Sequence, residues 1–550
     1  MMVDPATFNI VTTAFVAIAR EMSVDMRRVA FSSIIREAGD ASTAVLDRNG
    51  NVIAQAENIP IHLNSMGPAL RACLECFPAC DLRPGEVLMN NDPYSGAQHL
   101  SDIFLFSPVF INGDIVAFSA STGHYADLGG SPGFNLLAKD VYQEKLRFEP
   151  MKFSIERDWN GGLLERIIRS NVRLPRDVIG DFNAQLTANA KGARRITDLI
   201  AKYGKDTVLK CMAGFMSYAE KTLRAGISSM RDGVFEGQDL VDDDGIDDNP
   251  IVIRVRLEVR DDCLFVDFAG SDSQKKTAIN CPFASTVGAV LTAVKMILTD
   301  PELPFNDGFN APVHVSAPLG SILNPTKPAP CEGRHLVVIR AFQALVKAFA
   351  HAAPDRVAAT GFDTRTSIRF YLPIYNGYLC HQDSLGGGYG AYAFGDGESQ
   401  LDDPLGNCRN TPVEAFETSQ DYFRVIAYDL VQDSCGAGKY RGGLGARRVY
   451  EILEDDVLFT VASDRFKYRP EGLFGGMPGT CETITLHRDG QEIPVASKCM
   501  VNLRRGDIVE VRIGGGAGYG KPSERSKQLI EKDIREGKIS FEYARHFYKY

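Results

Sequence analysis

Two His-x-x-Asp pairs lie on either side of a predicted β-hairpin, and they are the residues of this chain best suited to chemistry. The pairs are His99 with Asp102 and His124 with Asp127. Between them, two apolar, aromatic and β-branched runs are joined through Asn112-Gly113, and both of these residues tolerate the positive φ of a type I′ turn. Such a turn brings the two pairs together at the open end of the hairpin.

The position of this turn also predicts the register of the two strands. A turn centred on Asn112-Gly113 places Asp102 opposite Gly123, and Ser101 opposite His124. Two imidazoles and two carboxylates gathered in this way suit a divalent metal such as Zn, Mn or Fe. The alternative is that each histidine only hydrogen-bonds the aspartate next to it in a loop. The convergence of two such pairs favours the metal.

The composition excludes several classes of function. The chain has 550 residues, of which 44% are hydrophobic and 24% charged, as in an ordinary globular protein with several lobes. Its 60 basic and 70 acidic residues are spread along the chain, and no basic stripe indicates a nucleic-acid or membrane partner. No apolar run is long enough to span a membrane, and the first residues lack the pattern of a signal peptide. We therefore expect a cytoplasmic protein with reduced cysteines.

Helices and hairpins must position the candidate residues, and their patterns predict a mixed α/β (α+β) fold of several lobes. A helix begins at Asp4-Pro5, and a hairpin turning at Asn49-Gly50 has Asp40 at its entrance. Further helices are predicted over 66–76, 163–202, 207–230, 284–299, 333–351 and 523–536. A third hairpin turns at Asp261-Asp262, and short strands dominate from residue 446.

These elements group into four predicted regions. They are a metal-bearing lobe of antiparallel hairpins and helices (1–235), a central α/β lobe (236–440), a β-rich lobe (441–522) and a C-terminal helical tail (523–550).

Other motifs are weaker candidates for a site. Cys73, Cys76 and Cys80 have a metal-like spacing, but helical periodicity favours one buried face, and no second CxxC completes a thiolate site. The segment 515–521 is close to a phosphate-binding loop. It lacks the Ser or Thr that would contact magnesium, so its glycines favour tight turns and close backbone approach.

Single residues with reactive or ligand side chains are weaker still. Cys331, with His335 nearby, is more typical of a structural cysteine than of a nucleophile. His62 lies between apolar residues and is more typical of a core histidine than of a ligand.

Several long motifs make the chain similar to the hydantoinase B/oxoprolinase family, from about residue 5 to 522. They include REAGDAS (36–42), NNDPYSGAQHLSDIFLFSPVF (90–110), GHYADLGG (123–130), DSCGAGKYRGGLG (433–445) and GGGAGYGKP (514–522). The resemblance implies one subunit of an ATP-dependent enzyme that opens cyclic amides, namely hydantoins, 5-oxoproline or lactams. The related acetone and acetophenone carboxylases are the alternative, and a purely structural partner protein is a third.

The same resemblance implies a partner and a site. A hydantoinase A-type subunit with an actin-like ATPase fold would bind ATP and Mg and phosphorylate the amide oxygen, in an α2β2 heterotetramer. The metal, Zn or Mn, would then be held by His99, Asp102 and His124, with Asp40 as a fourth ligand. A metal-bound water would attack the activated carbon. Asp127 would take its proton or support a ligand, and this chain itself would hold no ATP-binding residues.

Overall fold

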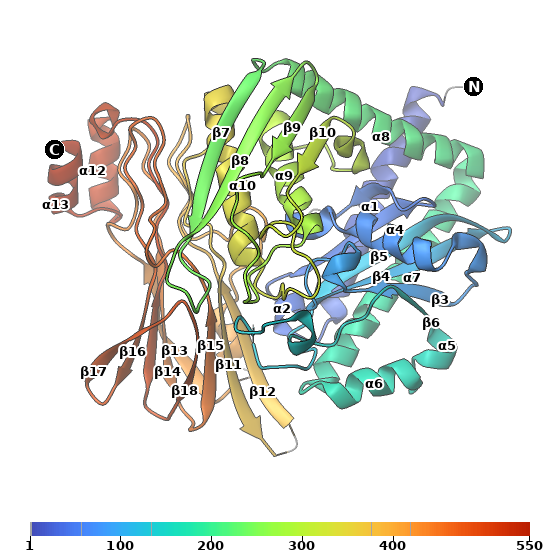
Figure 1. Ribbon diagram of the computed structural model, residues 1–550, viewed down its shortest axis with the longest axis horizontal. Coiled ribbons are helices and arrows are strands. Elements are labelled where there is room, and N and C mark those ends of the chain that lie inside the picture. The colour runs from blue at the N-terminus through green and yellow to red at the C-terminus, as the bar shows by residue number, and fades with distance from the viewer. Residues whose placement is uncertain (1–2, 57, 134, 376, 418–419) are drawn as a thin grey trace.

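The computed structural model of this protein describes residues 3–56, 58–133, 135–375, 377–417 and 420–550. Within these ranges, four sheets and the helices between them form the mixed α/β architecture that the sequence predicts. Figure 1 shows the N-terminal sheet with its helices on the right, a second sheet at the top, and two further sheets at the lower left.

The first sheet carries the candidate residues, and its neighbouring strands are antiparallel. Its order is β2 (Val52–Gln55), β1 (Ala41–Asp47), β5 (Asp114–His124), β4 (Asp102–Ile111), β3 (Glu86–Asn90) and β6 (Met151–Ser154). Helices α1 (Pro5–Val29) and α7 (Pro175–Tyr203) pack on the face that includes Val45, and α4 (Met66–Cys76) packs on the face that includes Leu46. The sheet is therefore buried on both faces, which fixes the ends of β4 and β5.

The predicted hairpin is confirmed, but its register differs by one residue from the expected one. Asn112 and Gly113 adopt positive φ values of 53° and 88° at the turn. Strand β5 then carries one extra residue, Val116, because the register shifts between Val109 and Phe110 of β4.

This bulge corrects the predicted pairing at the open end of the hairpin. Asp102 pairs with His124, and not with Gly123. The predicted pairing of Ser101 with His124 is wrong for the same reason. Directly opposed residues of an antiparallel pair lie on the same face of the sheet, so the bulge brings the side chains of Asp102 and His124 together.

The central part of the chain contributes a helical layer and a second sheet. Helices α5 (Ile155–Asp158), α6 (Leu163–Asn171) and α8 (Lys205–Ser228) precede a sheet of order β10 (Val313–Ser316), β9 (Cys263–Asp267), β8 (Ile251–Arg260) and β7 (Gly233–Val241). Helix α10 (His335–Ala352) packs on β7 and β8, and α9 (Phe283–Leu298) packs on α10. The buried α10 begins beside the ends of β4 and β5, as its contacts below show.

The C-terminal part is rich in β-structure, as predicted. One sheet has the order β12 (Gly377–Leu385), β11 (Thr366–Ile374), β15 (Val457–Ala462) and β18 (Lys498–Leu503). The other has the order β13 (Phe423–Leu430), β14 (Ala446–Ile452), β19 (Ile508–Arg512), β16 (Thr483–Arg488) and β17 (Gln491–Val495). The two sheets share one core around Phe370, Tyr450 and Phe459.

The predicted C-terminal helix is present as α12 (Lys527–Arg535). The division of the chain into lobes at residues 235, 440 and 522 stays a prediction. Strands β11 and β13, from before residue 440, pair with β15 and β14 from after it.

Glycine-rich segments run side by side where these sheets meet α10. Gly388 N donates to Gly514 O (3.1 Å), and Gly516 N donates to Gly443 O (3.0 Å). A Cβ atom on Gly516 would lie 2.0 Å from the carbonyl oxygen of Tyr389. The glycines of the segment 514–520 therefore serve the close backbone approach that the sequence predicts.

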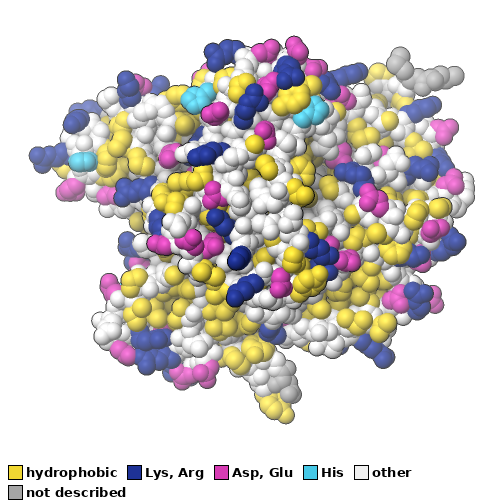
Figure 2. Space-filling view, viewed as in Figure 1, with side chains coloured by type: hydrophobic (Ala, Val, Ile, Leu, Met, Phe, Trp, Pro, Cys, Tyr) yellow, Lys and Arg dark blue, Asp and Glu magenta, His cyan; other side chains and the backbone are white. Residues whose placement is uncertain are grey.

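The three closely spaced cysteines do not share one buried helix face. Cys73 is buried, but Cys76 and Cys80 are exposed, so the prediction of one buried cysteine face is wrong for these two residues. The described helices include none with the length and apolarity to cross a membrane. On the face in Figure 2, acidic and basic side chains are interspersed, with apolar side chains between them.

Candidate metal centre

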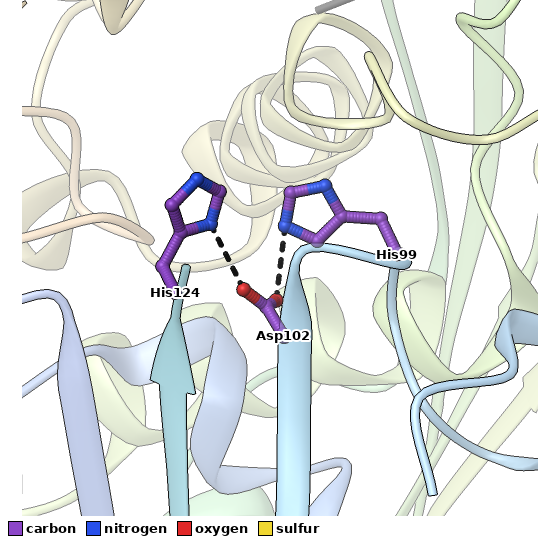
Figure 3. A group of neighbouring side chains, drawn as sticks. All are labelled: His99, Asp102 and His124. Atoms are coloured by element: carbon purple, nitrogen blue, oxygen red, sulfur yellow. Dashed lines mark hydrogen bonds and ion pairs between the residues drawn. The ribbon is translucent and has the colours of Figure 1, made fainter. Parts of the chain in front are cut away.

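Two histidines converge on one carboxylate at the end of the β4–β5 hairpin. His99 Nε2 lies 3.0 Å from Asp102 Oδ2, and His124 Nδ1 lies 3.0 Å from Asp102 Oδ1. One ligand atom of each residue lies within 4.8 Å of the others, and all three residues are buried. Figure 3 shows both rings pointing toward the carboxylate of Asp102. Two imidazoles and a carboxylate at this spacing form a donor set that zinc and manganese both accept.

Local backbone bonds hold this arrangement. Asp102 N donates to the carbonyl oxygen of His99 (3.1 Å), which turns the loop before β4 back toward the strand. His124 N donates to Asp40 O (3.0 Å), because β1 runs beside β5 and Ala41 pairs with Gly123. Asp40 and His124 are therefore next to each other, where the start of β1 lies beside the end of β5.

Asp40 and His62 complete the cluster. His62, in α3 (Pro60–Leu63), places Nε2 at 3.6 Å from Asp40 Oδ1 and at 3.4 Å from Asp102 Oδ2. Asp40 Oδ2 accepts a hydrogen bond from Arg365 Nη1 (3.2 Å), while the buried Asp40 Oδ1 has no hydrogen-bond partner among the described residues. The structure thus places Asp40 beside His99, Asp102 and His124. It also adds His62, which the sequence analysis favours as a core residue.

The contacts of His99 indicate that a cation fits here. Its Nδ1 lies 3.0 Å from the carbonyl oxygen of Glu332, which can only accept a proton, so Nδ1 is the donor. In the neutral ring, Nε2 then carries a lone pair directed at the carboxylate of Asp102. Two acceptors 3.0 Å apart need a proton or a metal ion between them. The orphaned Asp40 Oδ1 indicates the same need.

The electrostatics of the cluster favour ionised carboxylates at Asp40 and Asp102 and a neutral ring at His124. Burial opposes charge on Asp102, but His99 and His62 beside it hold the pKa of this carboxyl well below its usual value. Burial also opposes charge on Asp40, and His124 and Arg365 lower its pKa. Burial lowers the pKa of His124 to about 4. These are the protonation states that a metal ion requires of its ligands.

The cluster faces a small buried cavity where three parts of the fold meet. The space available to the centres of water-sized molecules is about 30 Å³, while one water needs about 10–15 Å³ on this measure. It is lined from the first sheet, from the start of α10 and from β11 and β12, by Asp40, Ile59, Ile61, His62, His99, His124, Arg334, His335, Arg365, Ser367, Gln382 and Ser384.

Sequence reasoning missed the charged residues that contact the cluster. Arg334 Nη2 lies 3.2 Å from Asp102 Oδ2, although the two residues are far apart in the chain. Arg369 Nη2 lies 3.3 Å from His124 Nε2. Glu332, which holds His99, accepts from Ser101 Oγ (2.8 Å) and forms an ion pair with Lys145. No motif or spacing in the sequence points to these residues, because their contacts join segments far apart in the chain.

Asp127, predicted to take a proton or to support a ligand, lies in a different set of contacts. Its Oδ1 accepts from Gly129 N (3.2 Å) and from Arg173 Nη1 (3.0 Å), and its Oδ2 accepts from Leu174 N (3.2 Å). Arg173 N also donates to Oδ2. These bonds tie the loop after β5 to the start of α7. The assignment of Asp127 as a catalytic base stays a prediction.

The cysteine candidate has the environment of a structural thiol. Cys331 is fully buried, and burial raises the pKa of its thiol well above the usual value. A nucleophilic cysteine needs the opposite shift. His335 lines the cavity beside the candidate metal ligands.

Comparisons with known proteins show what the whole chain is similar to. The family model described as Hydantoinase B/oxoprolinase matches residues 4–522. A Pseudomonas sp. protein, provisionally named as the B-type subunit of a D-/L-hydantoinase, is 31% identical over 98% of this chain and 94% of its own. The crystal structure of an ATP-dependent caprolactamase from Pseudomonas jessenii is similar with a TM-score of 0.91 and 29% identity, covering 99% of this chain and 96% of that chain. An acetone carboxylase structure shares the fold, with a TM-score of 0.91 at 18% identity, over 99% of this chain and 79% of that one.

Proposed function

The chain belongs to the hydantoinase B/oxoprolinase family, and from that premise we propose that it is the metal-bearing subunit of an ATP-dependent enzyme that opens cyclic amides. Relatives named hydantoinase, caprolactamase and 5-oxoprolinase act on rings that share one feature, an amide within the ring. The observation that carries the proposal is the convergence of His99 and His124 on Asp102, with Asp40 and His62 beside them.

A division of labour between two subunits supports this assignment. The glycine segment most like a phosphate loop is packed against other backbone, where a Cβ on Gly515 would lie 2.3 Å from Ser434 O. Relatives are named as B or beta subunits. We therefore assign ATP binding and phosphorylation of the amide oxygen to an A-type ATPase partner in an α2β2 assembly.

Phosphorylation by the partner makes the amide carbon electrophilic. One water oxygen then bonds to that carbon, the ring C–N bond breaks, and the nitrogen takes a proton. A second water releases phosphate from the resulting acyl phosphate and leaves the open-chain acid. His99, Asp102 and His124, with Asp40, would hold a divalent cation, which would act as a Lewis acid and lower the pKa of water at this site.

The remaining work is done by the chain itself. Glu332 fixes the ring of His99 through its carbonyl oxygen, and Asp40 keeps its place through Arg365. Ile59 and Ile61 line the cavity and keep bulk water from the ligands. Asp127 is assigned either as the proton acceptor or as support for the loop after β5, and its four contacts favour support.

Reconstitution with the partner ATPase tests the proposal. ATP hydrolysis by the complex is measured with a lactam, a hydantoin or 5-oxoproline, and in parallel with a ketone plus bicarbonate. We expect ring opening coupled to ATP use and dependent on the metal. The acetone carboxylase likeness shows the fold alone at 18% identity, but it names the alternative. Ketone-dependent ATP use that requires bicarbonate, without ring opening of any cyclic amide, would overturn the hydrolase assignment.

A further inference from the structure

Two arginines line the cavity beside the metal candidates. Arg334 comes from the start of α10, and its Nη2 lies 3.2 Å from Asp102 Oδ2. Arg365 comes from the segment before β11, and its Nη1 lies 3.2 Å from Asp40 Oδ2. Arg334 is 4% exposed, and its Nε is buried without a hydrogen-bond partner among the described residues. Each guanidinium group therefore contacts a carboxylate that is also assigned to the metal.

The charges around the cavity favour an anion beside Arg334. Arginine keeps its positive charge in proteins, so neither side chain can relieve the site by losing a proton. When the negative charges of Asp40 and Asp102 balance a bound divalent cation, the positive charges of the two arginines are no longer balanced by these carboxylates. Asp402 and Asp403 lie on one side of Arg365, with Oδ2 atoms 3.3 Å and 3.5 Å from its Nε. Arg334 has an ion pair with Asp102 as its one described salt bridge. The loaded site is thus short of an anion at Arg334.

The geometry of the guanidinium donors suits a phosphoryl group. A guanidinium offers several N–H groups in one plane, which matches the oxygens of a phosphoryl group. Arg334 uses Nη2 for Gln98 and Asp102, and its Nε is buried without a hydrogen-bond partner among the described residues, so this guanidinium keeps N–H groups for a ligand. Arg334 and Arg365 both line the same cavity as His99 and His124. An anion bound between them would lie next to the metal ligands.

We propose that Arg334 and Arg365 form an anion subsite that binds the phosphoryl group of the activated cyclic amide and the phosphate that leaves it. This inference rests on the proposed function. A phosphoryl group is the one anion that this reaction brings to the site with every cyclic amide, whether or not the ring itself carries a carboxylate. Bound there, it would orient the activated carbon toward the metal ligands.

The competing explanation is that the arginines only neutralise Asp40 and Asp102. A second is that they bind the carboxylate of a substrate such as 5-oxoproline. The three explanations differ in what the purified chain binds in the absence of its partner.

The test is a calorimetric titration of the metal-loaded chain with inorganic phosphate, with methyl phosphate and with 5-oxoproline. We expect both phosphates to bind, and 5-oxoproline to leave their affinity unchanged. In Arg334→Lys, which keeps the charge but loses the planar fork, we expect phosphate affinity to fall about tenfold or more. Metal content is expected to stay at the wild-type level in this variant. Arg424→Gln, at an exposed residue of β13, is the matched control and should bind phosphate normally.

The outcomes separate the inference from the proposed function. Absence of phosphate binding, binding of 5-oxoproline alone, or unchanged phosphate affinity in both Arg334→Lys and Arg365→Lys would overturn the subsite, even in a complex that opens lactams. If the chain binds phosphate through Arg334 but the reconstituted complex opens no cyclic amide, the subsite stands and the proposed function falls. Thermal unfolding of each variant identifies loss of the fold, and the lysine variants are chosen because they keep the charge beside the buried carboxylates.

Discussion

His62 Nε2 lies 3.4 Å from Asp102 Oδ2, although His62 belongs to the short helix α3 and Asp102 begins strand β4. The two side chains are 2% and 0% exposed. The same Nε2 atom lies 3.6 Å from Oδ1 of Asp40, the residue before β1, so the cluster combines residues from three separate parts of the fold. The metal candidates therefore depend on tertiary packing as well as on the His-x-x-Asp spacing.

The histidines of the hairpin are expected to be essential for metal binding. Removing the ring in His99→Ala or His124→Ala deletes one of three donors that lie within 4.8 Å of one another. We expect metal affinity to fall by more than about 100-fold, since loss even of a group that merely supports a ligand costs about 10–100-fold. Elemental analysis of the purified variants measures this. His314→Ala, at an exposed histidine of β10, is the control. Full metal content in both site variants would contradict the assignment.

His62 is expected to contribute to the same site. In His62→Ala we expect metal affinity to fall by about 10–100-fold, the range seen when a group next to a ligand is lost. A core histidine would behave differently, because its loss would lower thermal stability and leave metal affinity unchanged. Measuring the melting temperature and the metal dissociation constant of one preparation separates the two roles.

Asp127 is expected to support the loop after β5. In Asp127→Asn, the side chain loses its charge toward Arg173 and one acceptor for backbone N–H groups. We expect the free energy of unfolding to fall by about 1–3 kcal/mol, with an unchanged shape of the pH–activity profile. Arg173→Lys leaves the hydrogen bonds from backbone N–H groups to Asp127 in place, so its free energy of unfolding should fall by less. If Asp127→Asn instead keeps its stability, loses most of its activity and no longer shows the acidic limb of the profile, Asp127 is the base.

Local patterns in the sequence predicted the hairpin and its two histidines. Asn112-Gly113 defines the turn and the flanking alternation defines the strands, so both follow from short-range chemistry. The register did not follow, because the extra residue Val116 has no distinguishing side chain. A single bulge was enough to change the cross-strand partner of Asp102 from Gly123 to His124.

The rest of the site was hidden because its contacts are long-range. Arg334 and Arg365 reach Asp102 and Asp40 from the other half of the chain, and no spacing in the sequence encodes that proximity. His62 was set aside because a single histidine between apolar residues matches a core position. The fold class was predictable, since hydrophobic periodicity reports on individual helices and strands.

Backbone packing in the glycine segments gives a stability prediction. A Cβ on Gly516 would lie 2.0 Å from Tyr389 O, and this carbonyl oxygen cannot move aside without breaking the hydrogen bond that it accepts from Gly443 N (2.8 Å). We expect Gly516→Ala to lower the free energy of unfolding by more than about 4 kcal/mol, or to prevent folding. Gly377→Ala is the control, because its nearest neighbour is an atom 3.8 Å away. Equal melting temperatures for the two variants would contradict the packing.

Glu482 is expected to make stability depend on pH. This residue is fully buried between β15 and β16, and its Oε2 accepts from Thr366 Oγ1 (2.7 Å) and Ser463 Oγ (2.5 Å). Burial raises the pKa of Glu482 from 4.5 to about 8, so the folded protein keeps this carboxyl neutral at pH values where the unfolded chain ionises it. The folded state therefore binds one more proton than the unfolded state between these two values.

The sign of the effect follows from this difference in bound protons. Stability from Glu482 is fully present below pH 4.5 and is lost as the pH rises to about 8, by about 1.4 kcal/mol for each pH unit. Glu482→Gln is neutral at every pH and lacks this loss. We expect the variant to unfold at a higher denaturant concentration than the wild type at pH 8, and to lose that advantage at pH 5. An advantage of the same size at both pH values would show that the carboxyl is ionised in the folded protein, because only its titration makes the difference between the two proteins change with pH.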